Sequence, residues 1–261
     1  MQSKEIKRIV VKVGTSSLTY ATGKLNIKTI EKLVRVISDL RNRGIEVVLV
    51  SSGAIGAGVG KLGLSERPED TKKKQALAAS GPASLVSIYD RFFSEYGHIS
   101  AQVLLTKFIL DDDYRRSNTK NTFSAMFEYG VVPIVNENDV ISTYEIEFGD
   151  NDTLSAYVAK LVDADLLIIL SDIDGFYNGN PAENPDAELI PVIDEISDEI
   201  LALAGGAGSR RGTGGMRTKL SAAQLVTDAG IDMIIANGAR LENLYDIIDK
   251  KSVGTLFKAK K

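Results

Sequence analysis

Short apolar runs rich in β-branched residues alternate along the chain with longer segments in which apolar positions recur every three or four residues. The short runs predict strands at 9–13, 47–50, 102–105, 131–135, 166–170 and 231–236. The longer segments predict helices at 27–42, 75–96, 119–129, 153–162, 197–204, 216–229 and 241–248. The helix at 75–96 is expected to be interrupted near Gly81-Pro82, because proline lacks the backbone N–H that a helix interior needs.

This alternation of strands and helices predicts an α/β protein with a mostly parallel sheet that is covered on both faces. In such sheets, ligands bind beyond the carboxyl ends of the strands, so the segments that follow strands are the first places to search for a site. The 261 residues suit one large domain or two closely joined lobes, which would meet near Ala164-Asp165.

Composition narrows the possible chemistry. The chain has no cysteine, which excludes disulfides and thiolate metal sites, and its single histidine, His98, excludes zinc sites with two or three histidines. We expect His98 to be structural. The formal net charge of −4 argues against a nucleic-acid binder. No apolar run reaches the ~18 residues of a membrane span, and the N-terminus lacks a signal peptide, so we expect a cytoplasmic protein.

Two strand ends carry features that suit an anionic ligand. Lys12 lies inside an apolar strand, where it is either a lysine that extends out from an edge strand or one that is aimed at a phosphate. The strand at 47–50 continues into the glycine-rich segment SSGAIGAGVG, residues 51–60. Small residues let the backbone approach a ligand closely, although tight packing at a turn would also explain them.

Polar residues gather at two successive junctions between a predicted strand and a predicted helix. Together they predict one pocket for a zwitterionic small molecule. They are Asn136, Asp139, Asn151 and Asp152. The alternative for the second junction is helix capping, with Asp150 or Asp152 as the N-cap of a helix that starts at Thr153.

The segment 207–219, AGSRRGTGGMRTK, combines four basic residues with four glycines and has no acid. Approachable N–H groups and positive charge suit a polyphosphate, and the alternative is a mobile solvated loop. The strand at 166–170 is followed by Ser171 and Asp172. These two residues form either a turn or part of a polar cluster that would contact a nucleotide.

Taken together, these segments resemble the glutamate 5-kinases of the amino-acid kinase superfamily. The resemblance covers residues ~8 to ~258, and any one of its motifs alone would be weak. In chain order they are KVGTSSL from Lys12, SSGAIGAG from Ser51, VPIVNEND from Val132, FGDND from Phe148, LSDIDGFY from Leu170 and GTGGMRTKL from Gly212.

The resemblance implies a three-layer αβα sandwich in a single amino-acid kinase domain, with an amino-acid lobe over about 1–165 and a nucleotide lobe over about 166–261. It implies ATP- and Mg²⁺-dependent phosphorylation of the γ-carboxylate of L-glutamate, the first step of proline biosynthesis. Many members carry a further C-terminal PUA domain, and this chain is expected to be a short form without one.

The resemblance also implies a role for individual residues. Lys12 and Lys219 would stabilise the transferring phosphoryl group, and Asp152 would orient both lysines. The expected glutamate-binding positions are Ser52, Asp139 and Asn151, with Gly53 and Asn136 close by. The expected ATP-binding positions are Lys12, Ser171, Asp172, Gly212, Thr213, Gly214, Gly215, Met216, Arg217, Thr218 and Lys219.

Two other functions stay open: a sister kinase, such as one that acts on N-acetylglutamate, and a non-catalytic sensor of amino acids or nucleotides on the same fold. An acid in the acceptor pocket favours a free α-amino acid over an N-acetylated one. The resemblance further implies feedback inhibition by L-proline and a homo-oligomer, either a dimer or a tetramer.

Overall fold

The computed structural model describes residues 5–20, 22–106, 109, 112–142, 151–204 and 215–260. Its strands are β1 (Arg8–Val13), β2 (Glu46–Ser51), β3 (Ser100–Leu105), β4 (Val132–Glu137), β5 (Leu166–Ser171), β6 (Val192–Ile193), β7 (Asp232–Asn237) and β8 (Thr255–Phe257). Its helices are α1 (Thr15–Leu18), α2 (Ile27–Asn42), α3 (Ala54–Lys61), α4 (Thr71–Glu95), α5 (Asp113–Glu128), α7 (Asn151–Leu161), α8 (Asp198–Leu203), α9 (Met216–Thr227) and α10 (Asn243–Ile248).

The described strands form one sheet in the order β3-β4-β2-β1-β5-β7-β8-β6. Strands β3, β4, β2, β1, β5 and β7 run parallel to one another, and β8 pairs antiparallel with β7. All six predicted strands are confirmed. The sequence pattern did not predict β6 and β8, which have two and three residues and are too short to show a period.

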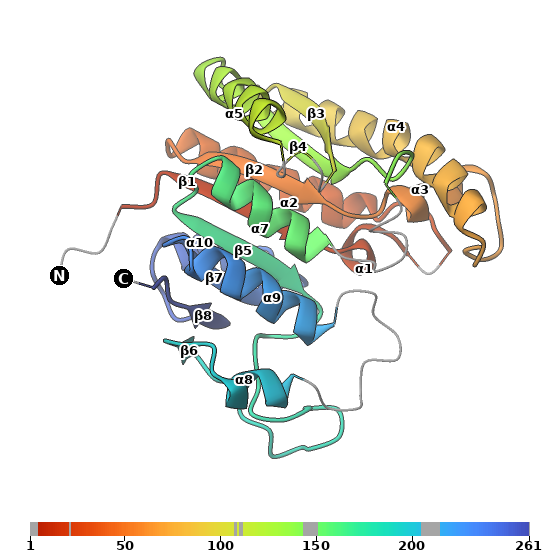
Figure 1. The fold of residues 1–261 in the computed structure, drawn as a ribbon. Helices are drawn as coiled ribbons and strands as arrows, with labels where there is room; N and C mark the ends of the chain where they lie inside the picture. Colours follow the sequence, from red (N-terminus) through yellow and green to blue (C-terminus); the bar gives the residue numbers. More distant parts are fainter. Residues whose placement is uncertain are drawn as a thin grey trace.

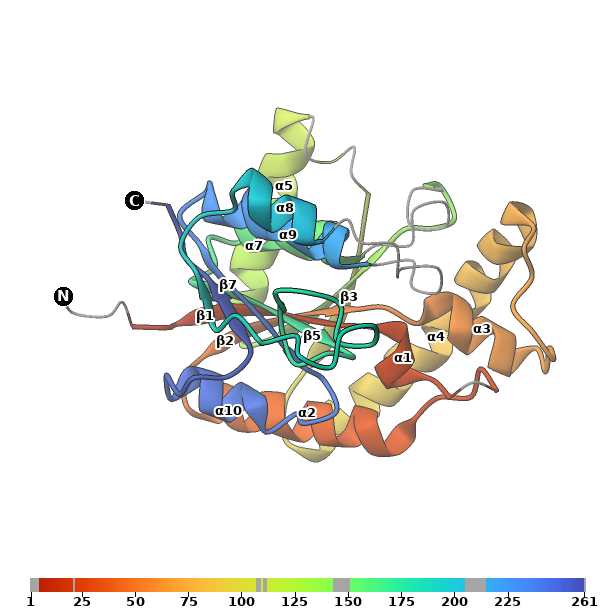
Figure 2. The ribbon, with the colours of Figure 1, turned by 90° about the horizontal axis from the view of Figure 1, so that it is seen from below.

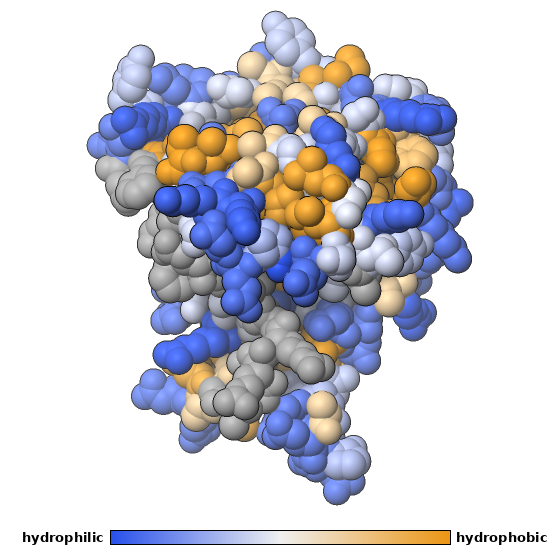
Figure 3. Space-filling view, turned by 90° about the vertical axis from the view of Figure 1, so that its right-hand side faces the viewer, coloured by the Kyte–Doolittle hydropathy of each residue, from blue (hydrophilic) through white to orange (hydrophobic). Residues whose placement is uncertain are grey.

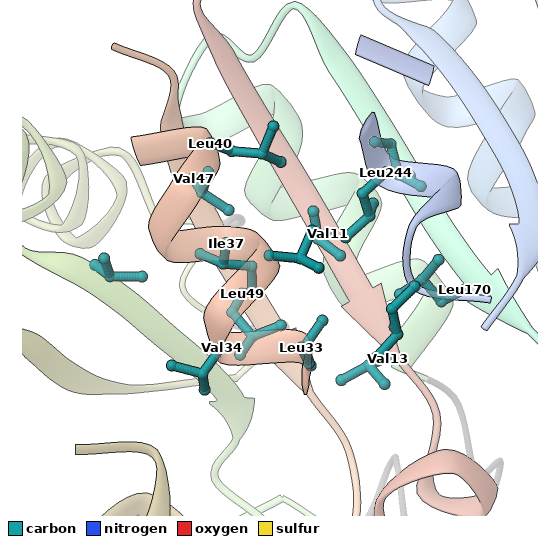
Figure 4. Packing of buried hydrophobic residues seen from close by; sticks show 14 of the residues in the cluster. Val11, Val13, Leu33, Val34, Ile37, Leu40, Val47, Leu49, Leu170 and Leu244 are labelled. Carbon is teal, nitrogen blue, oxygen red and sulfur yellow. The ribbon is translucent and has the colours of Figure 1, made fainter. Parts of the chain in front are cut away.

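Helices cover both faces of the sheet, which confirms the three-layer αβα architecture (Figures 1 and 2). Residues along β1 alternate between two apolar clusters. Ile9, Val11 and Val13 pack with α2, α4 and α10 on one face, whereas Val10 packs with α7 and α9 on the other. Figure 4 shows Val11, Val13 and Leu49 of the sheet against the apolar stripe of α2. Burial on both faces explains why these strands are continuously apolar.

The expected interruption near Gly81-Pro82 is wrong, because α4 runs through Pro82 without a break. The helix packs against α3 so closely that a Cβ on Gly81 would lie 1.8 Å from the carbonyl oxygen of Ala54. Side chains such as Leu77, Leu85 and Tyr89 are buried along its length. Tertiary packing therefore outweighs the loss of one helical hydrogen bond at Pro82.

No helix in the described part of the chain is both long enough and apolar enough to cross a membrane.

Because Gly81 lets two helices touch, Gly81→Ala should destabilise the protein by about 3 kcal/mol, the upper range for overpacking. Thermal unfolding followed by circular dichroism measures this change. Gly179→Ala is the matched control, since its Cβ would meet its nearest neighbour at an ordinary 3.6 Å. Equal melting temperatures for the two variants would contradict the packing argument.

Candidate active site

The candidate site lies at the edge of the sheet where the parallel strands end. Lys12 is the penultimate residue of β1, and Ser52 directly follows β2. Helices α7 and α9 both begin at this edge, on the same face of the sheet (Figures 1 and 2). Figure 3 looks onto this edge and shows apolar surface in the upper half of the view with hydrophilic residues around it. The topology thus brings together side chains that are far apart in the sequence.

A single carboxylate joins two lysines at the centre of this edge. Asp152 Oδ1 lies 2.7 Å from Lys12 Nζ, and its Oδ2 lies 3.1 Å from Lys219 Nζ. The Thr218 hydroxyl also donates a hydrogen bond to Oδ2, at 3.0 Å. Asp152 is fully buried, and Lys12 and Lys219 are only 7% and 6% exposed. The three residues come from β1, α7 and α9, and we call them the Lys12–Asp152–Lys219 cluster.

The cluster carries two positive charges and one negative charge in a buried setting. Burial alone would raise the pKa of Asp152, but the charges of Lys12 and Lys219 and their hydrogen bonds outweigh it and hold the pKa below its usual value. Asp152 is therefore ionised at neutral pH, and the three side chains together carry one more positive than negative charge. An anion such as a phosphoryl group is the complementary ligand.

These contacts decide between several of the interpretations. Lys12 does not extend from an edge strand, because β1 lies in the middle of the sheet. Asp152 is not an N-cap, because α7 begins at Asn151 and the Asp152 carboxylate binds the lysines. Asp150 lies outside the described residues.

Next to the cluster, Asn151 organises a second group of predicted residues. Its side-chain amide donates to Ser52 Oγ at 2.9 Å and to Asn136 Oδ1 at 3.0 Å. All three side chains are buried. Gly53 is the N-cap of α3 and has φ +98°, a conformation that favours glycine. The structure thus brings the residue that follows β2 and a residue near the end of β4 to the first turn of α7.

Asp139 lies in the turn that follows β4 and is 3% exposed. Among the described residues, its Oδ1 has no hydrogen-bond partner. Burial, together with the negative charge of Glu137, raises the pKa of Asp139 to about 7, although the positive charge of Arg67 opposes the shift. A buried acid with an unpaired oxygen is a candidate partner for a cationic group of a ligand.

The predicted nucleotide residues lie on two elements. Ser171 is the last residue of β5 and Asp172 follows it, and the Ser171 hydroxyl donates to Asp172 Oδ1 at 3.1 Å. Gly215, Met216 and Arg217 begin α9, which also carries Thr218 and Lys219. The predicted residues Gly212, Thr213 and Gly214 lie outside the described residues.

A cavity of about 610 Å³ opens at the carboxyl ends of β1, β5 and β7. It is lined by residues such as Ser17, Lys28, Ser171, Asp172 and Asn237. Its lining includes the predicted Ser171–Asp172 pair, and it extends from that pair toward the start of α2.

Some residues near the site escaped the sequence analysis. Glu137 is buried and accepts a hydrogen bond from the Ser142 hydroxyl at 2.6 Å. Tyr89 of α4 shares a buried hydrogen bond of 2.9 Å with Ser51. The position of Glu137 between Asn136 and Asp139 was a usable signal, but nothing in the α4 sequence pointed to Tyr89. His98 is bonded to the Ser38 carbonyl oxygen at 3.2 Å, in keeping with a structural role.

A model of the amino acid kinase family matches residues 7–237, which include the αβα sheet up to β7 and the Lys12–Asp152–Lys219 cluster at its strand ends. The chain therefore belongs to the amino acid kinase family. Within it, the glutamate 5-kinase of Clostridium perfringens is 58% identical over 262 residues, which cover 99% of this chain and 97% of the relative. The glutamate 5-kinase of Clostridium tetani is 56% identical, with 98% and 96% of the two chains covered.

Solved structures agree on the fold. The UMP kinase of Bacillus anthracis superposes with a TM-score of 0.66 at 16% identity, over 99% of this chain and 98% of that one. The isopentenyl phosphate kinase of T. acidophilum superposes with a TM-score of 0.65 at 19% identity, over 97% of this chain and 100% of that one. At these identities, the likeness supports the αβα fold only.

Replacing the shared carboxylate tests the electrostatics of the cluster. Asp152→Asn removes the carboxylate that the two buried ammonium groups share, so it should lower the free energy of unfolding at pH 7 by about 3 kcal/mol or more. The lowered pKa adds a pH signature, because the stabilisation by Asp152 is present above the unfolded-state pKa of about 4 and is lost as the pH falls through the lower folded-state pKa.

Chemical denaturation at pH 7 and in steps below pH 4 measures both effects. Asp186→Asn, at an exposed position in the 178–191 loop, is the matched control. An Asp152→Asn protein as stable as this control at pH 7 would show that the ion pairs contribute no net stability.

Proposed function

We propose that this chain transfers the γ-phosphoryl group of MgATP to the γ-carboxylate of L-glutamate, which forms L-glutamyl 5-phosphate in the first step of proline biosynthesis. The observation that carries the proposal is the buried Lys12–Asp152–Lys219 cluster directly beside the Asn151-centred acceptor pocket. The high identity to glutamate 5-kinases over nearly the whole chain supports the choice of acceptor.

The acceptor pocket offers groups that complement both ends of a zwitterion. Ser52, Asn136 and Asn151 supply hydroxyl and amide groups for a carboxylate. Asp139 supplies a buried carboxylate for the α-ammonium group. An N-acetylated acceptor lacks this positive charge, so the pocket favours free glutamate over N-acetylglutamate.

The chemistry follows from the charges. The γ-carboxylate of glutamate has a pKa near 4.3, so it is already an anionic nucleophile at neutral pH and needs no general base. One of its oxygens attacks the γ-phosphorus in line while the bond to the β-phosphate oxygen breaks, and ADP leaves with that electron pair. Lys12 and Lys219 offset the repulsion between two anions and stabilise the negative charge of the transferring group. Asp152 orients both lysines and accepts no proton.

Several further features belong to the proposal. In this proposal, residues from about 1 to 165 bind the amino acid, and residues from about 166 to 261 bind the nucleotide. Mg²⁺ would be bound mainly through the phosphates of ATP. The expected homo-oligomer, inhibition by L-proline and a cytoplasmic location stay predictions, and no nucleic-acid partner is proposed.

A hydroxylamine trap tests the reaction, because acyl phosphates are captured as coloured hydroxamates. The protein is incubated with MgATP and with glutamate, N-acetylglutamate or aspartate. We expect a signal with glutamate that L-proline suppresses. A signal with another acid alone would replace the acceptor, and ATP binding without any signal would favour a non-catalytic sensor.

The two lysines should act directly in turnover. Lys12→Ala and Lys219→Ala should each lower kcat by about 100-fold, as observed when a single electrostatic donor is removed from a transition state. Steady-state kinetics with saturating MgATP measures the change. Lys160→Ala, at an exposed position on α7, is the control. Turnover near that of the parent protein in folded Lys12→Ala or Lys219→Ala would refute their role.

A further inference from the structure

Glu137 is a buried acid that the proposed phosphoryl transfer does not use. It is the last residue of β4, is 4% exposed and lies two positions before Asp139. Burial of two carboxylates that repel one another lowers the free energy of unfolding. Such a pair is therefore expected where each acid binds a partner residue or a ligand.

The first role of Glu137 is in the shape of the turn at 137–142. The Ser142 hydroxyl, itself buried, donates to Glu137 Oε1 at 2.6 Å and so joins the two ends of the turn. Within the turn, the backbone N–H groups of Ile141 and Ser142 donate to the Asn138 carbonyl at 3.1 and 3.0 Å. Asp139 lies inside this closed turn, so its side chain is held where it is buried.

Neighbouring elements fix the turn in place. The Asn138 N–H donates to the Leu105 carbonyl of β3 at 2.7 Å. The Gln75 side chain of α4 donates to the Val140 carbonyl at 3.2 Å. The acceptor pocket therefore has a wall that is anchored at both ends.

The second role of Glu137 is electrostatic. Among the described residues, two charged groups act on Asp139: Glu137 from the end of β4, and Arg67 from the segment between α3 and α4. Arg67 is exposed, and no basic nitrogen of a described residue lies within the 4.0 Å of an ion pair to Asp139. Two acids and one unpaired carboxylate oxygen make a buried negative site, which is complementary to a primary ammonium group.

We propose that Glu137 is a positioning and specificity-determining residue of the acceptor pocket: it closes the 137–142 turn through Ser142 and, as a second carboxylate beside Asp139, selects acceptors with a free α-ammonium group. The inference rests on the proposed function and deepens it.

A pH dependence follows from this arrangement. Burial and the charge of Glu137 raise the pKa of Asp139 to about 7, so Asp139 is neutral below that pH and ionised above it. Binding of an ammonium group favours the ionised form and releases a proton. We expect kcat/KM for glutamate to rise with pH through about 7 and then to level off, whereas kcat/KM for MgATP stays nearly flat.

Three variants separate the two roles. Glu137→Gln removes the charge but keeps an oxygen that can accept from Ser142. Ser142→Ala removes the hydrogen bond but keeps the charge. Glu128→Gln, at the exposed end of α5, is the matched control. Melting temperatures show that each protein is folded before kinetics are compared.

For Glu137→Gln we expect the acid limb of kcat/KM for glutamate to move about one pH unit lower, because a nearby like charge is lost. At pH 8, KM for glutamate should rise about fivefold to tenfold, and at pH 6 the increase in KM should be smaller. Both kcat and KM for MgATP should stay within about twofold of the parent values. Ser142→Ala should raise KM for glutamate by a similar factor at every pH without moving the limb.

Calorimetry of glutamate binding in buffers of different ionisation enthalpy gives a readout that does not depend on turnover. The parent protein should release about half a proton per glutamate at pH 7, and Glu137→Gln should release clearly less. An unchanged acid limb and unchanged proton release in folded Glu137→Gln would overturn the inference. A parent protein that forms no hydroxamate with glutamate would refute the proposed function instead, so the two failures are distinguishable.

Discussion

The burial of one carboxylate between two ammonium groups is the constraint on which the rest of the structure depends. Asp152 has no exposed surface, so its charge is tolerated only because Lys12 and Lys219 approach both of its oxygens. This requires β1 to end beside the first turns of α7 and α9. The parallel pairing of β1 with β2 and β5 and the packing of both helices on the same face provide that placement.

The acceptor pocket depends on the same arrangement, because Asn151 and Asp152 are neighbours in the first turn of α7. Asn151 binds Ser52 and Asn136, while Asp152 binds the lysines. The residues that would receive glutamate and those that would stabilise the phosphoryl group are thus held by one rigid turn. Proximity of the two reactants then follows from backbone geometry, which is a large part of what phosphoryl transfer between two anions requires.

The sequence predicts the sheet and most of the site well, because both leave local signals. Continuous apolar runs mark the buried strands, and polar residues directly after them mark the strand ends. What it misses depends on contacts between distant segments. The break expected at Pro82 does not occur because Gly81 lets α4 press against α3. The capping role considered for Asp152 does not occur because two lysines, 140 and 67 positions away in the chain, each bind one of its oxygens. Tyr89 can be recognised as part of the site only when its burial and its contact with Ser51 are known, whereas Glu137 had a local signal in its position between Asn136 and Asp139.

Because Asn151 and Asp152 lie on one helical turn, different elements of the fold would contact the two substrates. The groups that would handle phosphate come from β1, α7 and α9, whereas the groups that would recognise the acceptor come from the ends of β2 and β4. Substitutions on β2 and β4 can therefore change which acceptor is bound while the phosphoryl chemistry stays intact. A one-residue insertion between Asn151 and Asp152 would rotate one group away from the other by about 100° and would uncouple the two halves of the reaction. Such a scaffold lets specificity diverge through substitutions but resists changes in the length of α7 at its first turn.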